Sequence, residues 1–146
     1  MSTVSRTIDA PVTAVWEVLS DPWLYASWVV GAARIRGVDG DWPAAGARLH
    51  HSVGVWPLLL SDHTVVEESQ PGSRLQLLAK AWPGGEARVV IEIADTGATT
   101  STVTMHEDAV NGPGRLIPSP ARRAALHVRN VESLRRLAFL AEGRKP

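Results

Sequence analysis

Residues 8–28 read IDAPVTAVWEVLSDPWLYASW, and this stretch decides the fold. The pair Ala10-Pro11 begins a helix, because proline is favoured in the first turn, where its missing N–H costs no hydrogen bond. Asp21 begins a second, shorter helix, since its carboxylate can accept from the exposed N–H groups of a helix start. Both helices follow a short strand expected at residues 3–8. Their inward-facing residues are expected to be Val12, Val15, Trp16 and Leu19, followed by Leu24, Tyr25 and Trp28.

Beyond Gly31 the helical period gives way to an alternation of apolar and polar residues. Glycine, proline or aspartate stands in every gap, and such short loops favour antiparallel pairing of neighbouring strands. Along one run Leu75 and Leu77 alternate with Gln76, so that one face of the strand is buried and the other is wet. The strands are predicted at residues 32–38, 47–55, 59–68, 74–82, 87–94 and 99–109.

The last expected element is a helix of more than twenty residues, with Ser119-Pro120 as its start and Gly143 as its stop. An apolar stripe along this helix is predicted to cover the concave sheet, the only large apolar surface available to it. The stripe consists of His127, Val131, Leu134, Ala138 and Ala141. The residues placed on the far, solvated side are Arg122, Arg129, Glu132 and Arg136.

This order of elements resembles the START-like superfamily, also called SRPBCC, and within it the bacterial polyketide cyclase/dehydrase group. The resemblance implies an α+β helix-grip fold, a curved antiparallel sheet wrapped around a long C-terminal helix with an apolar cavity. It also implies a single domain over residues 1–146. The fold serves many functions, so function has to be argued from the site. The residues that carry the resemblance are Ile8 to Pro11, Val15 to Leu19, Asp21-Pro22, Tyr25, Trp28 and the tail from Leu126 to Leu137.

A cavity is expected on physical grounds as well. One helix cannot fill a strongly curved sheet unless large side chains lie between them, and the chain has a single phenylalanine and a single tyrosine. The expected partner is a small hydrophobic molecule such as a lipid, a quinone or a polyketide-like compound. The residues expected to line the ligand site are His51, Leu75, Leu77, Val89, Ile91, Val103, Met105, His127, Asn130, Val131 and Leu134.

Two polar residues share strand parity with inward apolar neighbours. His51 lies two positions from Leu49, and Glu107 lies two positions from Met105, so each is expected to point to the same face as its apolar neighbour. A buried carboxylate has a raised pKa and can act as a base. Two readings of Glu107 stay open, an inward carboxylate or a solvated residue at a frayed strand end.

His127 and Asn130 lie on or beside the apolar stripe of the last helix, where burial requires hydrogen-bond partners. One reading is ligand binding or proton transfer. The other is that they pin the helix to the backbone or to the loop at residues 112–118. The candidate catalytic residues are therefore His51, Glu107 and His127.

Three of the six tryptophans, Trp42, Trp56 and Trp82, directly precede proline in predicted turns. A tryptophan at a cavity mouth can gate the cavity or stack on a ligand. The alternative is that each Trp-Pro pair packs its own loop onto the adjacent hairpin.

Composition excludes several classes of function. There is no cysteine, and the five histidines show no metal-binding spacing, so neither a metal nor any other cofactor is expected. A net charge of +0 predicts no binding of nucleic acid. The chain shows no secretory signal and no apolar run that could be inserted stably in a membrane, so a cytoplasmic location is expected. The sequence leaves the oligomeric state undetermined.

Three hypotheses follow. The preferred one is a carrier or sensor that binds a small hydrophobic ligand. The second is an enzyme of the polyketide cyclase or aromatase type that uses the same pocket. The third is an interaction module that uses the basic face of the last helix, with Arg129 and Arg136 as its cations.

Overall fold

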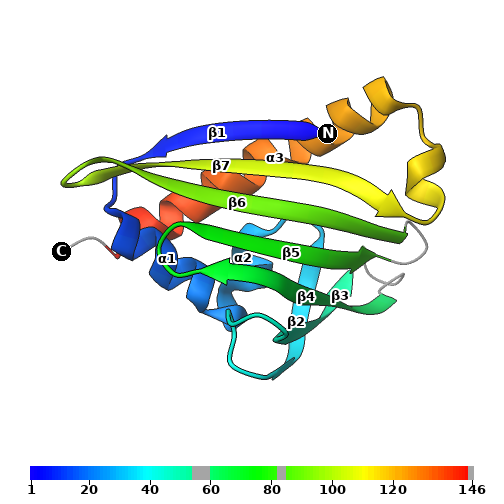
Figure 1. Ribbon diagram of the computed structural model, residues 1–146, viewed down its shortest axis with the longest axis horizontal. Helices are drawn as coiled ribbons and strands as arrows, with labels where there is room; N and C mark the ends of the chain where they lie inside the picture. Colours follow the sequence, from blue (N-terminus) through cyan, green and yellow to red (C-terminus); the bar gives the residue numbers. More distant parts are fainter. Residues whose placement is uncertain (54–59, 82–84, 145–146) are drawn as a thin grey trace.

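The computed structural model describes residues 1–53, 60–81 and 85–144 (Figure 1). Its elements follow the expected order. The strands are β1 (Ser2–Ile8), β2 (Ala32–Asp39), β3 (Arg48–Val53), β4 (Leu60–Gln70), β5 (Arg74–Ala81), β6 (Gly85–Gly97) and β7 (Thr100–Asn111). The α-helices are α1 (Val12–Ser20), α2 (Tyr25–Trp28) and α3 (Ser119–Glu142), and the 3-10 turns η1 (Pro22–Leu24) and η2 (Pro113–Leu116) precede α2 and α3.

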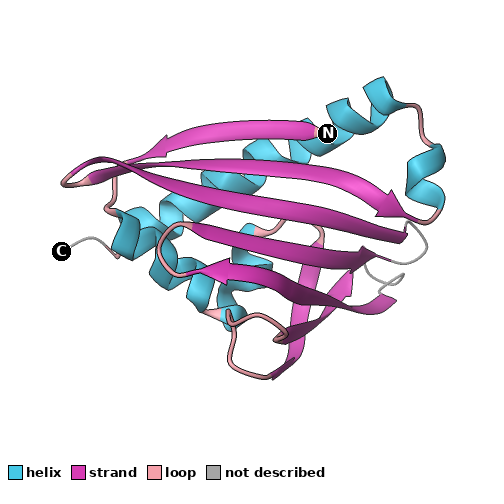
Figure 2. Ribbon diagram, in the orientation of Figure 1, coloured by secondary structure: helices cyan, strands magenta, loops and turns pink. Residues whose placement is uncertain are grey.

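The strands form one seven-stranded antiparallel sheet in the order β1-β7-β6-β5-β4-β3-β2. The strands β2 to β7 form a meander, and β1 pairs with β7 at its far edge. Figure 2 shows the sheet curving around the helices, which lie on one of its faces. The helix α3 packs against β1, α1 and α2. The predicted α+β helix-grip architecture is confirmed.

The alternation read from the sequence gives the sheet one buried face. On β7, Ser101, Val103, Met105 and Glu107 are buried, and the residues between them are half-buried. The predicted inward residues of the neighbouring strands are also buried, which confirms their orientation: Leu75, Leu77, Val89 and Ile91. Because side chains alternate strictly along a strand, the pattern alone decides which of them enter the core.

The segment between β1 and β2 forms the two expected helices. Val15 and Leu19 on α1 are buried as predicted, whereas Val12 and Trp16 are only half-buried against the core. Ala14 and Val18, which the pattern did not single out, are buried as well. The carboxylate of Asp21 accepts a hydrogen bond of 3.0 Å from the backbone N–H of Trp23, as the capping prediction requires. The two inward aromatic residues of α2, Tyr25 and Trp28, are buried.

The predicted face of α3 is wrong in part. His127 is exposed and Val131 is 41% exposed, so neither faces the sheet. Arg129, expected on the solvated side, turns toward the sheet instead. Ser119 does not cap the helix, because Pro118 occupies the cap position and no side chain accepts there. The buried residues of the helix are Asn130, Ser133, Leu134, Leu137, Ala138 and Ala141.

The two halves of α3 differ in burial. The C-terminal half covers the sheet and α1, whereas residues 119–129 are exposed or half-buried throughout. In Figure 1 this N-terminal half extends past the start of β1, where the N-terminus is marked, beside η2. The interior between sheet and helix is therefore closed by α3 toward one end of the molecule and less covered toward the other.

Candidate functional site

A row of three alanines crosses the inward face of the sheet at the less covered end. Ala79 on β5 is in register with Ala87 on β6, and Ala87 with Ala109 on β7. Each lies two positions from a buried inward residue, yet all three are only half-buried. We call Ala79, Ala87 and Ala109 the alanine row. Their small side chains leave this part of the concave face accessible to solvent. Thr64 on β4 continues the row at one side, and Glu107 lies next to it on β7.

A buried group of hydrogen-bonded polar side chains lies at the β4 side of the alanine row. His51 Nε2 and Thr64 Oγ1 are 2.9 Å apart, and the Thr64 hydroxyl is also hydrogen-bonded to the phenol of Tyr25. His51 is 3% exposed and Thr64 is fully buried. We call Tyr25, Thr64 and His51 the histidine group. The expected inward orientation of His51 is confirmed, whereas His50 lies on the other face, 2.7 Å from Asp39.

Aromatic rings hold the histidine group in place. The imidazole of His51 stacks on the ring of Tyr25 with centroids 5.9 Å apart. Trp28 and Trp42 pack edge-on against the same tyrosine, at 5.6 and 6.3 Å. The indole N–H of Trp42 donates a hydrogen bond of 3.0 Å to the Leu19 carbonyl, which fixes the turn onto α1. Trp42 thus packs its own loop, as the second alternative states, although onto α1 and Tyr25 and not onto the adjacent hairpin. Trp56 and Trp82 lie outside the described residues.

Burial keeps the histidine group uncharged at neutral pH. Desolvation lowers the pKa of His51, and the other charged groups around it act more weakly. Desolvation also raises the pKa of the Tyr25 phenol above its ordinary value of 10.0. The more distant charges of Glu107 and Arg129 act on the same phenol with opposite signs.

A second polar group lies at the β7 side of the alanine row. The carboxylate of Glu107 forms an ion pair with Arg129 and accepts a hydrogen bond of 3.0 Å from the side-chain amide of Asn130. Glu107 is 3% exposed, so the reading of a frayed, solvated strand end is wrong. We call Glu107, Arg129 and Asn130 the carboxylate group. Asn130 pins α3 to the sheet, although its partner is Glu107 and not the loop at residues 112–118.

Each of the two polar groups contains one unpartnered nitrogen. Within the described part of the chain, four buried side-chain atoms have no hydrogen-bond partner: the hydroxyl oxygens of Ser2 and Ser20, and two nitrogens, His51 Nδ1 and Arg129 Nε. A buried polar atom without a partner costs about 1–3 kcal/mol, so such atoms are rare in folded proteins. Both nitrogens therefore indicate places where a bound molecule or water gains a hydrogen bond.

The predicted site residues divide into two sets. Nine of them are buried between sheet and helix: His51, Leu75, Leu77, Val89, Ile91, Val103, Met105, Asn130 and Leu134. His127 and Val131 face solvent and cannot line this space. The roles of the nine buried residues in ligand binding stay predictions.

Sequence reasoning missed Thr64 and Arg129 as members of the site. Strand parity with the buried Val66 indicates that Thr64 points inward, so the sequence held a usable signal for it. The sequence held no such signal for Arg129, because a charged residue next to a buried asparagine fits a solvated helix face equally well. Arg129 turns inward because it contacts Glu107, which lies 22 residues earlier in the chain.

The outer face of the sheet carries a separate, shallow pocket of about 390 Å³. The outward-facing Arg74, Glu92 and Thr104 are among the residues that line it. Arg74 forms an ion pair with Glu68 at 3.0 Å, and Glu92 one with His106 at 2.9 Å. Since neighbouring side chains already pair with these charges, the pocket offers a ligand fewer unpartnered polar groups than the interior does.

The described residues contain no group of three side chains placed to hold a metal ion. Among the helices described here, none is both long and apolar enough to cross a membrane.

Residues 2–142 match the family described as polyketide cyclase/dehydrase and lipid transport. The chain belongs to this family. No protein with curated annotation matches the sequence. Membership confirms the predicted superfamily, and the family description is consistent with an interior that accepts an apolar molecule.

Solved structures share the fold of this polyketide cyclase/dehydrase family member at low sequence identity. Protein NE0264 from Nitrosomonas europaea matches with a TM-score of 0.73 and 19% identity, over 97% of this chain and 93% of that one. The Zhui aromatase/cyclase from Streptomyces sp. R1128 matches with a TM-score of 0.72 and 18% identity, over 97% and 93%. The di-domain aromatase/cyclase StfQ from the steffimycin biosynthetic pathway matches at 0.71 and 13%, over 97% of this chain and 51% of that one.

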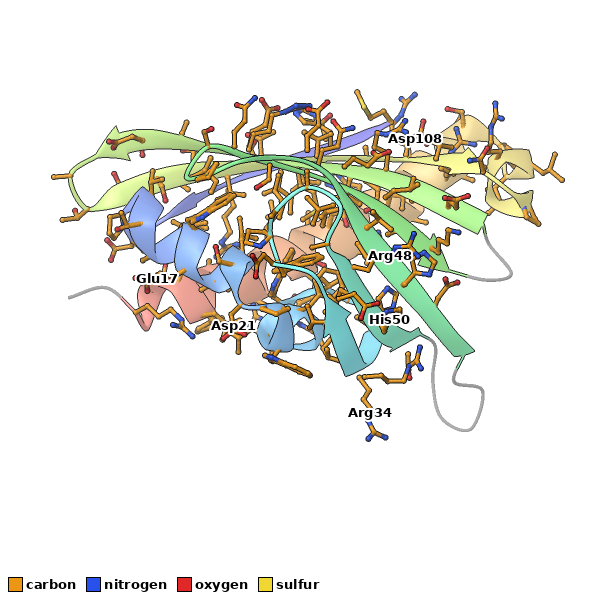
Figure 3. All side chains as sticks on the ribbon, turned by 60° about the horizontal axis from the view of Figure 1, so that its bottom comes forward. Glu17, Asp21, Arg34, Arg48, His50 and Asp108 are labelled. Atoms are coloured by element: carbon orange, nitrogen blue, oxygen red, sulfur yellow. The ribbon has the colours of Figure 1, made fainter. Side chains whose placement is uncertain are left out.

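The basic face of α3, which supported the third hypothesis, is partly neutralised by ion pairs in this family member. Arg129 is paired with Glu107, and Arg136 with Glu132 at 3.0 Å. Arg122 donates to Asp108 at 2.8 Å, and Figure 3 shows Asp108 at the end of β7 beside the start of α3. These ion pairs weaken the interaction-module hypothesis, since its two named cations already have partners.

Proposed function

We propose that the protein binds a small apolar molecule that carries an oxygen-containing polar group, in the space between the sheet and α3. The observation that carries the proposal is the pair of buried, unpartnered nitrogens, His51 Nδ1 and Arg129 Nε, in an interior whose buried side chains are mainly apolar. A ligand oxygen that reaches either atom restores a missing hydrogen bond.

The alanine row supports an entry route on the same side. Ala79, Ala87 and Ala109 are half-buried although they point inward, so the interior is open to solvent next to them. The buried aliphatic side chains beyond the row provide the apolar surface that small-molecule sites require. The matched family, described as polyketide cyclase/dehydrase and lipid transport, agrees with a ligand of this kind.

Titration with Nile red, an uncharged dye whose emission shifts to the blue in apolar surroundings, tests this proposal. We expect saturable binding to the wild-type protein. Ala79→Phe fills the inward side of the row and is expected to weaken binding about tenfold or more, because the ring occupies ligand space. Lys80→Phe places the same ring one residue further along, on the outer face, and is expected to leave binding within about twofold.

Circular dichroism establishes that both variants are folded. If Ala79→Phe does not fold, Ala87→Leu tests the same space with a smaller side chain. The proposal fails if the wild-type protein shows no saturable binding, or if an inward variant binds as tightly as the wild type while folded. Native mass spectrometry of the protein from its own host then identifies the retained molecule.

A second candidate function is catalysis of the aromatase/cyclase type, as the printed names of Zhui and StfQ describe for those two proteins. The histidine group favours it, because a neutral imidazole joined to a hydroxyl is suited to accept and return a proton. Incubation with a linear poly-β-ketone thioester tests it, with loss of water measured by mass spectrometry. Loss of turnover in His51→Gln, with a circular dichroism spectrum like that of the wild type, is the expected result. Absence of turnover in the wild type contradicts it.

A further inference from the structure

We propose that the interior site selects uncharged ligands with a hydrogen-bond acceptor, such as a ketone or an ester, over carboxylates with the same apolar body. This inference rests on the proposed function, since it names the chemical class of ligand for the same site. It follows from the balance of charge among the polar side chains that reach the interior.

The carboxylate group has no net charge. The unpartnered Nε atom belongs to the cation Arg129, but Glu107 already forms an ion pair with this guanidinium. The Asn130 side-chain amide donates to the same carboxylate. The Arg129 side chain is 37% exposed and Glu107 only 3%, so the negative partner is the deeper of the two. A carboxylate ligand placed beside Arg129 Nε therefore meets Glu107 and no spare positive charge.

The histidine group supplies no compensating cation either. Burial keeps His51 neutral by lowering its pKa, so it does not present an imidazolium to an anion. Tyr25 and Thr64 are neutral hydroxyls at physiological pH. Among the further groups acting on His51, Asp62 raises its pKa, whereas His63, Arg36 and His50 lower it. An anion in this interior is therefore desolvated without a counter-charge, which is costly.

The unpartnered atoms define what the ligand must offer. Arg129 Nε carries a hydrogen and can only donate, so its partner must be an acceptor. His51 Nδ1 donates or accepts according to the tautomer, and a carbonyl or a hydroxyl oxygen can pair with one form or the other. A ketone, an ester or a phenol satisfies both requirements and brings no charge.

A matched pair of probes tests the inference directly. 2-Acetylnaphthalene and 2-naphthoate have the same ring system and nearly the same volume, but only the second carries a charge at pH 7. Affinities are measured by displacement of Nile red from the wild-type protein. We expect the ketone to bind about tenfold more tightly or better, since the carboxylate loses its hydration without gaining a free cation.

Removing the negative partner is expected to change this preference. Glu107→Gln keeps the shape of the side chain but leaves Arg129 uncompensated, so 2-naphthoate gains at least about tenfold relative to the ketone. Glu92→Gln removes an exposed carboxylate on the outer face and is expected to leave the ratio unchanged. If Glu107→Gln does not fold, Arg129→Gln replaces it, and this variant is expected to disfavour 2-naphthoate further.

The outcomes separate this inference from the function on which it rests. If the wild type binds Nile red but prefers 2-naphthoate or binds both probes equally, selection for uncharged ligands is overturned and the binding site stands. A folded Glu107→Gln with the wild-type ratio overturns the charge argument in the same way. If neither the dye nor either probe binds, the proposed function itself has failed.

Discussion

Asn130 on α3 donates a hydrogen bond of 3.0 Å to Glu107 on β7, and the preceding helix residue, Arg129, forms an ion pair with the same carboxylate. Consecutive residues of a helix point about 100° apart, so only one rotation of the helix brings both to a single acceptor. This contact explains why the buried face of α3 includes Ser133 and Leu137 while Val131 faces solvent.

Breaking the Glu107–Arg129 ion pair is expected to destabilise the protein. Arg129→Met leaves a buried carboxylate without its cation and is expected to lower the free energy of unfolding by about 2 kcal/mol. The loss is smaller than for a fully buried pair, because Arg129 is 37% exposed. The measurement is urea denaturation at pH 7.

The control for this pair is Arg136→Met, which breaks an exposed ion pair with Glu132 at 3.0 Å. It is expected to change the free energy of unfolding by less than about 1 kcal/mol. The double variant Glu107→Gln/Arg129→Met is expected to lose less than the sum of the two single variants. If the loss of the double variant equals the sum of the two single losses, the two side chains do not stabilise the fold as a pair.

Thr64 is expected to be needed for its hydroxyl and not for its volume. Thr64→Val preserves the shape but removes the hydrogen-bond partner of His51 and Tyr25, both buried. We expect a loss of about 1–3 kcal/mol in thermal or urea unfolding. Thr64→Ser retains the hydroxyl and is expected to lose less. Equal stability of the two variants contradicts the hydrogen-bonded arrangement described above.

Stability is expected to fall as the solution is acidified, because burial lowers the pKa of His51 from its ordinary value near 6.5. Below that pH the unfolded chain binds a proton that the folded protein does not. The free energy of unfolding therefore decreases as pH falls from about 6.5 toward the folded pKa, by up to about 1.4 kcal/mol per pH unit.

His51→Gln is expected to reduce this slope, measured by urea denaturation between pH 5 and pH 8. Burial also lowers the pKa of His63, so His63→Gln is the matched control for the share that this second histidine contributes. A slope that is unchanged in His51→Gln shows that the imidazole is not protected from protonation in the folded state.

The buried face of α3 can be mapped by paired substitutions. Leu134 is fully buried, and Leu134→Ala is expected to reduce the free energy of unfolding by about 2–5 kcal/mol. Val131→Ala, three residues earlier on the solvated face, is expected to cost less than about 0.5 kcal/mol. His127→Ala is likewise expected to be nearly neutral, because the residue is exposed. A large loss in either of the last two variants contradicts the observed rotation of the helix.

The sequence by itself determined the order of elements, the two helices after β1 and the inward faces of β3, β5, β6 and β7. These features depend on local chemistry: a proline or an aspartate at a helix start, and strict alternation along an extended chain. The inward orientation of His51 followed from the same alternation, and so did that of Glu107, although the possibility of a frayed end remained open.

Only the tertiary structure decided the rotation of α3 and the composition of the polar groups. The apolar stripe of this helix is broad, and an angular pattern permits several rotations that differ little in apolar burial. The buried carboxylate of Glu107 selects among them, since leaving it without Arg129 and Asn130 costs more than exposing Val131. The rotation therefore depends on contacts between residues 22 and 23 positions apart along the chain, which a local sequence pattern cannot show.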